Sequence, residues 1–232
     1  MDAVDKLIRF DLGRRLQDDK NSLENVHKTF WSNQQADGWY AATNHKLELV
    51  YIPNYSRFVD EVADKIRSRG IKNLVEFGTG NGLWLEYLST RFSGLVSCIG
   101  IDLSESQIRA NTKMLPGIEF IRDDIDKWIQ SNLMGDTIYH TNSGVLEYLS
   151  EDSVERMFST IKSRARNSFM FLIEPVSLDC DPKKLMRSWV GGEELSYSHN
   201  YKNILERLNF RIEICEDLVV DNHKTVVILA GT

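Results

Sequence analysis

The sequence has few cysteines and no long apolar run. Its three cysteines, Cys98, Cys180 and Cys215, are widely spaced and form no C-x-x-C pair, so nothing indicates a zinc site, another metal or a redox couple. A reduced intracellular compartment fits these cysteines best. No apolar stretch approaches the ~20 residues of a membrane span, and residues 1–15 lack the apolar core of a signal peptide. The sequence therefore predicts a soluble, cytoplasmic protein without a membrane partner.

An excess of positive charge is also missing. The formal net charge is −6 over 232 residues, which disfavours nucleic acid and anionic membranes as partners. The chain has no internal repeat and no low-complexity linker, and its length fits one domain or one domain with a cap. A hydrophobic fraction of 42% is enough for a sizeable core. Nothing in these features indicates an oligomeric state.

Strand-like and helical segments alternate from residue 71 onward. Apolar, strand-like runs lie at 72–77, 95–101, 118–121, 136–140, 168–174, 210–215 and 225–230. Helical segments separate most of them and begin near Gly82, Ser104, Ser150 and residue 200. This alternation predicts an α/β fold, with a mainly parallel sheet covered by helices on both faces. The last two runs are separated only by a turn at Asp221-Asn222, so we predict that they form an antiparallel hairpin.

Residues 1–55 precede this pattern, and we predict that they form an N-terminal helical cap or lid. Apolar residues from Val4 to Leu16 recur at helical spacing, whereas residues 21–55 show little periodicity and many aromatic rings. Such rings can enclose a small molecule, exclude water and hold a cation. We therefore predict that the substrate is bound by Trp31, Trp39, Tyr40 and His45. The alternative is that the aromatic residues only pack against the sheet.

The most informative segment is a glycine-rich turn between a predicted strand and a predicted helix, Val75-Glu76-Phe77-Gly78-Thr79-Gly80-Asn81-Gly82. Glycines at such a turn permit positive φ and let the backbone approach a nucleotide-like ligand. The spacing is G-x-G-x-G rather than the G-x-G-x-x-G of dinucleotide-binding proteins. Glu76 lies two residues before the first glycine, where it would repel a pyrophosphate but favour an ammonium and a sulfonium. This favours S-adenosylmethionine (SAM) as the cofactor.

Acidic residues also follow the next two predicted strands. Asp102 ends the second run, 20 residues after Gly82, where a carboxylate can accept hydrogen bonds from ribose hydroxyls. After the third run, Asp124 could accept from an exocyclic amine, and Ile125 could lie on a purine face. The alternatives are that Asp102 only caps the following helix and that Asp124 is a solvated surface residue.

With these elements in order, the chain resembles the class I SAM-dependent methyltransferases. The matching residues are Glu76 to Gly82, Asp102 and Asp123-Asp124-Ile125, and the segment from Asp136 to Leu149 looks like the fourth-strand segment of that family. The resemblance covers about residues 55–232. It implies a Rossmann-like, seven-stranded, mostly parallel sheet with a C-terminal antiparallel hairpin. We thus predict a SAM-binding methyltransferase domain over residues 56–232, with a substrate-covering insertion at about 175–199.

The resemblance also implies a set of cofactor-binding residues, namely Glu76, Gly78, Thr79, Gly80, Asp102, Leu103, Asp124, Ile125 and Asn142. In that family the glycine turn lines the methionine part of the cofactor. Asp102 would bind the ribose hydroxyls, and Asp124 with Ile125 would contact adenine. Asn142 or Ser143 would lie below the sulfonium.

Three residues are candidates for the catalytic step. An amine acceptor needs only to be deprotonated, whereas a hydroxyl usually needs a general base such as histidine. His140 lies at the fourth predicted strand, Glu174 ends the fifth and His199 lies in the insertion. The alternative for His140 is a hydrogen-bonded, structural histidine. His27 and His45 are further candidates, which the sequence does not rank.

Several substrate-specific motifs are missing. No Asn-Pro-Pro-Tyr-like element follows the fourth run, which disfavours planar base or amide nitrogens, and no Pro-Cys pair offers a nucleophile for cytosine C5 chemistry. The function that remains is SAM-dependent methylation of an oxygen or nitrogen of a small molecule, such as a specialised metabolite, an amino acid derivative or a sugar. The alternatives are an NAD-dependent Rossmann oxidoreductase and a non-catalytic SAM-binding protein.

Overall fold

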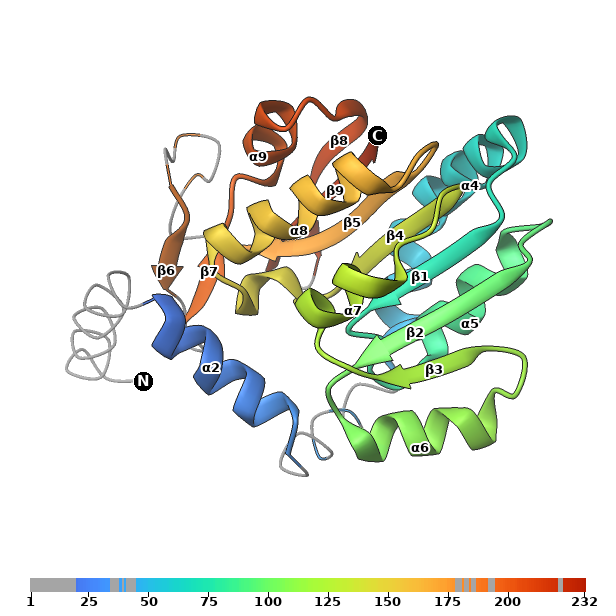
Figure 1. Cartoon of the computed structure of the whole chain (residues 1–232), viewed down its shortest axis with the longest axis horizontal. Helices are drawn as coiled ribbons and strands as arrows, with labels where there is room; N and C mark the ends of the chain where they lie inside the picture. The colour runs from blue at the N-terminus through green and yellow to red at the C-terminus, as the bar shows by residue number, and fades with distance from the viewer. Residues whose placement is uncertain are drawn as a thin grey trace.

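The computed structural model describes residues 20–33, 38, 40, 45–177, 181, 184, 187–191, 195–220 and 223–232. In this part of the chain, helices cover both faces of a central sheet (Figure 1). The predicted helix from Val4 to Leu16 lies outside the described residues. No helix among the described residues has the length and apolar character needed to cross a membrane.

The central sheet has seven strands in the order β3-β2-β1-β4-β5-β9-β8. They are β1 (Asn73–Phe77), β2 (Ser97–Asp102), β3 (Glu119–Arg122), β4 (Thr137–Asn142), β5 (Phe169–Val176), β8 (Arg211–Val220) and β9 (His223–Gly231). Strands β1 to β5 pair in parallel, and β9 is antiparallel to both of its neighbours. The predicted strands, the mainly parallel sheet and the C-terminal hairpin are therefore confirmed.

The parallel strands are apolar because both of their faces are buried. Side chains alternate between the faces, so Val75 and Phe77 belong to one core cluster and Leu74 to the other. The first cluster is covered by α7 (Ile125–Asn132), α8 (Glu151–Arg164) and α9 (Tyr201–Arg207). The second is covered by α4 (Ile52–Arg69) and α5 (Leu83–Arg91). The sheet is thus held rigidly between two apolar layers.

The helices begin and end where the local sequence predicts. Helix α4 ends at Gly70, which has a φ of 64°, and α5 begins directly after Gly82. Ser104 is the N-cap of α6 (Glu105–Met114), and its Oγ accepts a hydrogen bond from the backbone N–H of Gln107 at 3.3 Å. Ser150 caps α8 in the same way. These caps fix the start of each helix relative to the sheet edge.

Removal of the α6 cap tests whether Ser104 stabilises the start of this helix. We expect Ser104→Ala to lower the free energy of unfolding by about 1 kcal/mol, because one helix N–H loses its side-chain acceptor. Urea unfolding measures this change. Ser163→Ala, at an exposed position in the last turn of α8, is the matched control and should leave the midpoint unchanged. Equal midpoints for both variants would contradict the assigned cap.

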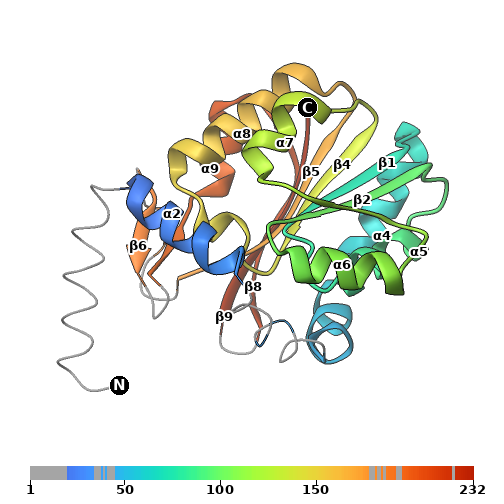
Figure 2. The same cartoon turned by 60° about the horizontal axis from the view of Figure 1, so that its bottom comes forward.

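The N-terminal segment and the predicted insertion pack against each other. Helix α2 (Lys20–Trp31) passes the carboxyl ends of the strands (Figure 2). A small antiparallel sheet, formed by β6 (Trp189–Gly191) and β7 (Ser196–Ser198), lies within the insertion. Leu23 of α2 packs with Val190 and Tyr197 of this sheet. A short helical turn, η2 (Leu47–Tyr51), continues directly into α4, so the predicted boundary at residues 55 and 56 falls inside a helix.

Candidate functional site

A pocket lies at the carboxyl ends of β1, β2 and β4, the place where open α/β sheets bind ligands. The strand order puts β2 and β4 on either side of β1, so segments far apart in the sequence meet at this edge. All the residues predicted to bind the cofactor line the pocket: Glu76, Gly78, Thr79, Gly80, Asp102, Leu103, Asp124, Ile125 and Asn142. The structure therefore brings the predicted set together in one space.

The glycine turn of this pocket needs glycine for two physical reasons. Gly78, Gly80 and Gly82 have φ values of 68°, 51° and 74°, which residues with a Cβ rarely adopt. A Cβ on Gly78 would also lie 2.5 Å from a methyl group of Val145, and one on Gly80 would lie 3.2 Å from the Tyr40 ring. The turn is thus packed tightly between the loop after β4 and a residue of the N-terminal segment.

Glu76 is a buried carboxyl group that faces the pocket. Its side chain is 3% exposed, its Oε2 accepts a hydrogen bond from Thr79 Oγ1 at 2.7 Å, and its Oε1 lies 3.8 Å from Nε2 of His140. Burial raises the pKa of Glu76 to about 8, because a charge is poorly solvated there. A cationic group entering the pocket would stabilise the carboxylate form.

Asp102 ties the glycine turn to the end of β2. Its Oδ2 accepts from the Gly80 N–H and its Oδ1 from the Ser104 N–H, both at 2.9 Å. The Tyr40 hydroxyl also donates to Oδ1, at 3.4 Å. Burial raises the pKa of Asp102, and these hydrogen bonds oppose that rise. The N-cap residue of α6 is Ser104 rather than Asp102.

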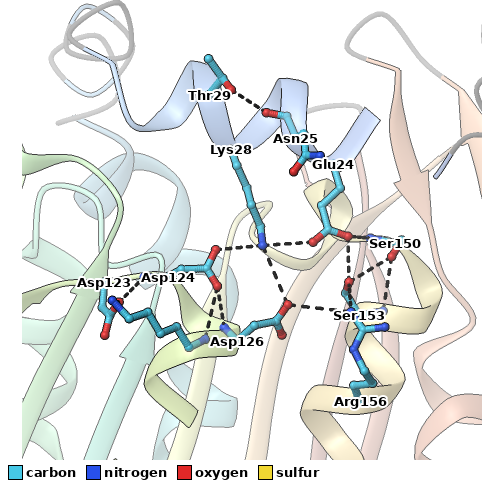
Figure 3. Close-up of polar contacts among 11 residues, drawn as sticks. Glu24, Asn25, Lys28, Thr29, Asp123, Asp124, Asp126, Ser150, Ser153 and Arg156 are labelled. Atoms are coloured by element: carbon cyan, nitrogen blue, oxygen red, sulfur yellow. Dashed lines mark hydrogen bonds and ion pairs between the residues drawn. The ribbon is translucent and has the colours of Figure 1, made fainter. Parts of the chain in front are cut away.

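Asp124 is held from two sides (Figure 3). As the N-cap of α7, its Oδ1 accepts from the backbone N–H groups of Asp126 and Lys127. Its Oδ2 forms an ion pair with Nζ of Lys28 at 2.8 Å. Lys28 also lines the pocket and is a residue that the sequence reasoning missed. The one signal for it is Glu24, four residues earlier, since that spacing pairs charges on a helix.

Aromatic side chains form part of the pocket wall. Trp31 and Tyr40, two of the predicted substrate residues, line the pocket with ring centroids 5.8 Å apart. Tyr148 also lines it, 5.3 Å from Trp31. Two more rings, Tyr51 and Trp84, line the pocket near Glu76. His45 is exposed and does not line the pocket, and Trp39 lies outside the described residues.

The two histidines predicted as catalytic do not line the pocket. His140 is fully buried beneath it, where Nε2 accepts from Trp84 Nε1 at 2.8 Å and Nδ1 donates to the Phe171 carbonyl at 2.7 Å. Burial lowers the pKa of His140 to about 3. His199 is 1% exposed, with Nε2 3.0 Å from the Leu146 carbonyl, and burial lowers its pKa to about 4. Both rings are therefore hydrogen-bonded inside the fold rather than exposed to the pocket, and a catalytic role for either stays a prediction.

The third predicted catalytic residue, Glu174, is also fully buried and does not line the pocket. Its Oε2 accepts hydrogen bonds from the N–H groups of Val145 and Leu146, at 3.2 and 3.3 Å. Burial raises the pKa of Glu174 to about 8. The carboxyl group therefore supports the loop after β4, which forms the pocket floor. The predicted insertion contributes no described residue to the lining.

Comparisons with known proteins agree with this geometry. Residues 74–167 match the family model of a methyltransferase domain. A crystal structure of magnesium protoporphyrin IX methyltransferase from Synechocystis PCC 6803 with bound SAM is similar, with a TM-score of 0.60 and 16% identity over 90% of this chain and 96% of that one. A SAM-dependent methyltransferase from Mesorhizobium loti has a TM-score of 0.52 and 18% identity over 75% of this chain and 100% of that one. No curated protein matches the sequence. At these identities, the likeness to the solved structures shows a shared fold.

Proposed function

We propose that the protein is a class I SAM-dependent methyltransferase, which transfers the methyl group of SAM to an oxygen or nitrogen of a small molecule. The match of residues 74–167 to the model of a methyltransferase domain and the fold shared with a SAM-bound methyltransferase support this proposal. The observation that carries the proposal is that one pocket is lined both by the residues predicted to bind the cofactor and by the aromatic rings of Trp31, Tyr40 and Tyr148. An acceptor held against those rings lies next to the predicted cofactor residues.

The residues of the pocket fit SAM. Glu76 is a buried carboxyl group that forms no ion pair with a lysine or arginine in the described part of the chain, so it suits the ammonium of a ligand. Asp102 lies at the end of β2, where a ribose is bound in sheets of this kind, and Leu103 and Ile125 offer apolar contacts for a flat base. When bound, SAM supplies an electrophilic methyl group on its sulfonium.

The protein's own contribution is alignment and exclusion of water. Trp31 and Tyr40 come from the N-terminal segment and line the pocket together with Tyr148 of the loop after β4. Aromatic rings present apolar faces and can hold a cationic amine by cation–π contact. These features support a small acceptor rather than a protein or nucleic acid chain. Such an acceptor is a specialised metabolite, an amino acid derivative or a sugar.

The described residues that line the pocket include no histidine. This supports an acceptor whose nucleophilic atom reaches the pocket already deprotonated, such as a neutral amine or an acidic hydroxyl, because a histidine base is the usual device for other hydroxyls. Burial raises the pKa of Tyr51, so its phenol is neutral near pH 7. The hydroxyl can therefore donate a hydrogen bond to the molecule that receives the methyl group.

Calorimetry with SAM, its demethylated product and NAD tests the cofactor. We expect binding of the first two, and at least tenfold weaker binding of SAM by Asp102→Ala, because the turn and ribose site lose their carboxylate. Asp60→Asn, at an exposed position of α4, is the control and should bind as the wild type does. NAD binding without SAM binding would overturn the proposal in favour of an oxidoreductase.

A screen with SAM carrying a labelled methyl group tests methyl transfer. Amines, phenols, carboxylic acids and sugars are offered as acceptors, and the label is followed into the product. We expect label transfer to one chemical class. If SAM binds tightly and no acceptor of any class is labelled, the protein is a non-catalytic SAM-binding protein.

A further inference from the structure

Helix α2 is joined to the rest of the domain by two charged side chains, one helical turn apart. Glu24 and Lys28 contact each other at 3.1 Å, and both point from α2 toward the start of α7 and α8 (Figure 3). Glu24 Oε2 accepts from the Ser150 N–H at 2.9 Å and from Ser153 Oγ at 2.8 Å. Glu24 therefore fixes α2 to the N-terminus of α8.

Lys28 is the central cation of an acidic cluster. Its Nζ lies 2.8 Å from Asp124 Oδ2 and 3.8 Å from Asp126 Oδ2, in addition to its contact with Glu24. Exposed ion pairs contribute little to stability. Lys28, however, is only 27% exposed and has three carboxylate partners. Without it, the one other cation that pairs with these three carboxylates among the described residues would be Arg156, 4.0 Å from Asp126.

The Asp124 carboxylate is fixed in orientation by this arrangement. Its Oδ1 is held by the first N–H groups of α7, and its Oδ2 is held by Lys28. Asp124 and Lys28 both line the pocket, and so does Trp31, which lies three residues after Lys28 on the same helix face. A displacement of α2 would therefore release Asp124 and remove part of the aromatic wall at the same time.

We propose that Lys28 is a positioning residue for the cofactor, which orients the Asp124 carboxylate at the adenine end of the pocket and locks α2 over that pocket. This inference rests on the proposed function, since it assumes that Asp124 contacts the adenine of SAM. It assigns α2 a role in cofactor retention: the helix stays closed while Lys28 and Glu24 hold the starts of α7 and α8.

Calorimetric titration of SAM into lysine variants tests the proposal. We expect Lys28→Met to weaken SAM binding about tenfold or more and Lys28→Arg to restore most of the affinity. Lys127→Met is the matched control, because Lys127 pairs with Asp123 at 3.7 Å and its side chain is 80% exposed outside the pocket. Its affinity should equal that of the wild type. Thermal unfolding of each variant confirms that the fold is kept.

A double-mutant cycle shows whether Lys28 acts through Asp124. In the Asp124→Asn background, Lys28→Met should change SAM affinity less than twofold. Hydrogen exchange is the second readout: SAM should slow exchange in residues 20–31 of the wild type, and Lys28→Met should abolish this protection. Wild-type affinity in Lys28→Met, or fully additive losses in the cycle, would overturn the proposal. If the wild type itself does not bind SAM, the proposed function fails instead.

Discussion

SAM affinity is expected to rise about tenfold between pH 6 and pH 7 and to reach a maximum near pH 8. In the free protein, burial raises the pKa of Glu76 to about 8, so this group holds a proton at pH 6. The ammonium of SAM, an α-amino group with an ordinary pKa of ~7.7–8.0, also holds one. The bound pair of Glu76 and amino group shares a single proton, so binding releases one proton below pH 8. Above pH 8 the amino group loses its proton, and affinity falls.

Calorimetry in two buffers with different ionisation enthalpies counts this proton directly. Burial also raises the pKa of Asp102, so the Glu76→Gln variant is needed to assign the effect. We expect that variant to bind SAM at least tenfold more weakly and to release no proton near pH 6.5, because the amide does not titrate. An affinity of the wild type that is constant from pH 6 to pH 8 would contradict the assigned partner of Glu76.

It was possible to predict from the sequence that the glycine turn, Asp102 and Asp124 line one pocket. Each of them is identified by its local sequence, and the topology of a parallel sheet brings them together. The turn and each acidic residue follow an apolar run, and the carboxyl ends of parallel strands meet at one edge of the sheet. The tight packing of Gly78 against Val145 agrees with the glycine pattern. The sequence therefore carried enough information for the sheet, its hairpin and the lining of the pocket near the turn.

The role of His140 depends on how far below the pocket surface its ring lies, and the sequence pattern does not show this. His140 lies two residues before Asn142 on β4, and side chains two apart share a face of the sheet. Asn142 reaches the pocket, whereas His140 lies one step lower, under Trp84 and beside Glu76. The position of His140 near the end of β4 therefore places it close to the pocket. A shift of two residues along the strand, from Asn142 to His140, separates a side chain that lines the pocket from one that is buried.

Lys28 and Glu24 were missed for a different reason. On a helix, a lysine four residues after a glutamate is a common surface pattern. Its meaning here comes from Asp124 and Ser150, about a hundred residues further along the chain. The tertiary packing of α2 beside the starts of α7 and α8 turns this ion pair into the proposed determinant of cofactor binding.

Glu174→Gln is expected to flatten the dependence of stability on pH while keeping the fold. Burial raises the pKa of Glu174 from 4.5 to about 8, so the folded state keeps a proton that the unfolded state loses in this range. The stabilisation from this group is fully present below pH 4.5 and is lost as the pH rises through 8. The slope is at most about 1.4 kcal/mol per pH unit for one group. Below pH 6.5 the slope is opposed by His140 and His199, whose lowered pKa values make stability rise with pH. Between pH 7 and pH 8 these histidines are neutral in both states, and Glu76 adds a slope of the same sign as Glu174, so Glu174→Gln should remove about half of the slope that the two carboxyl groups produce there.

Urea unfolding at several pH values between 7 and 9 measures this effect. Glutamine keeps an oxygen that can accept from the Val145 and Leu146 N–H groups, whereas Glu174→Ala leaves both without an acceptor, so the alanine variant should lose stability at every pH. It should also bind SAM more weakly, because Val145 packs against Gly78. Glu86→Gln, at an exposed position of α5, is the control and should keep the wild-type slope. If Glu174→Gln keeps that slope as well, the proton does not reside on Glu174; if it abolishes methyl transfer while SAM still binds, the residue has a catalytic role rather than a supporting one.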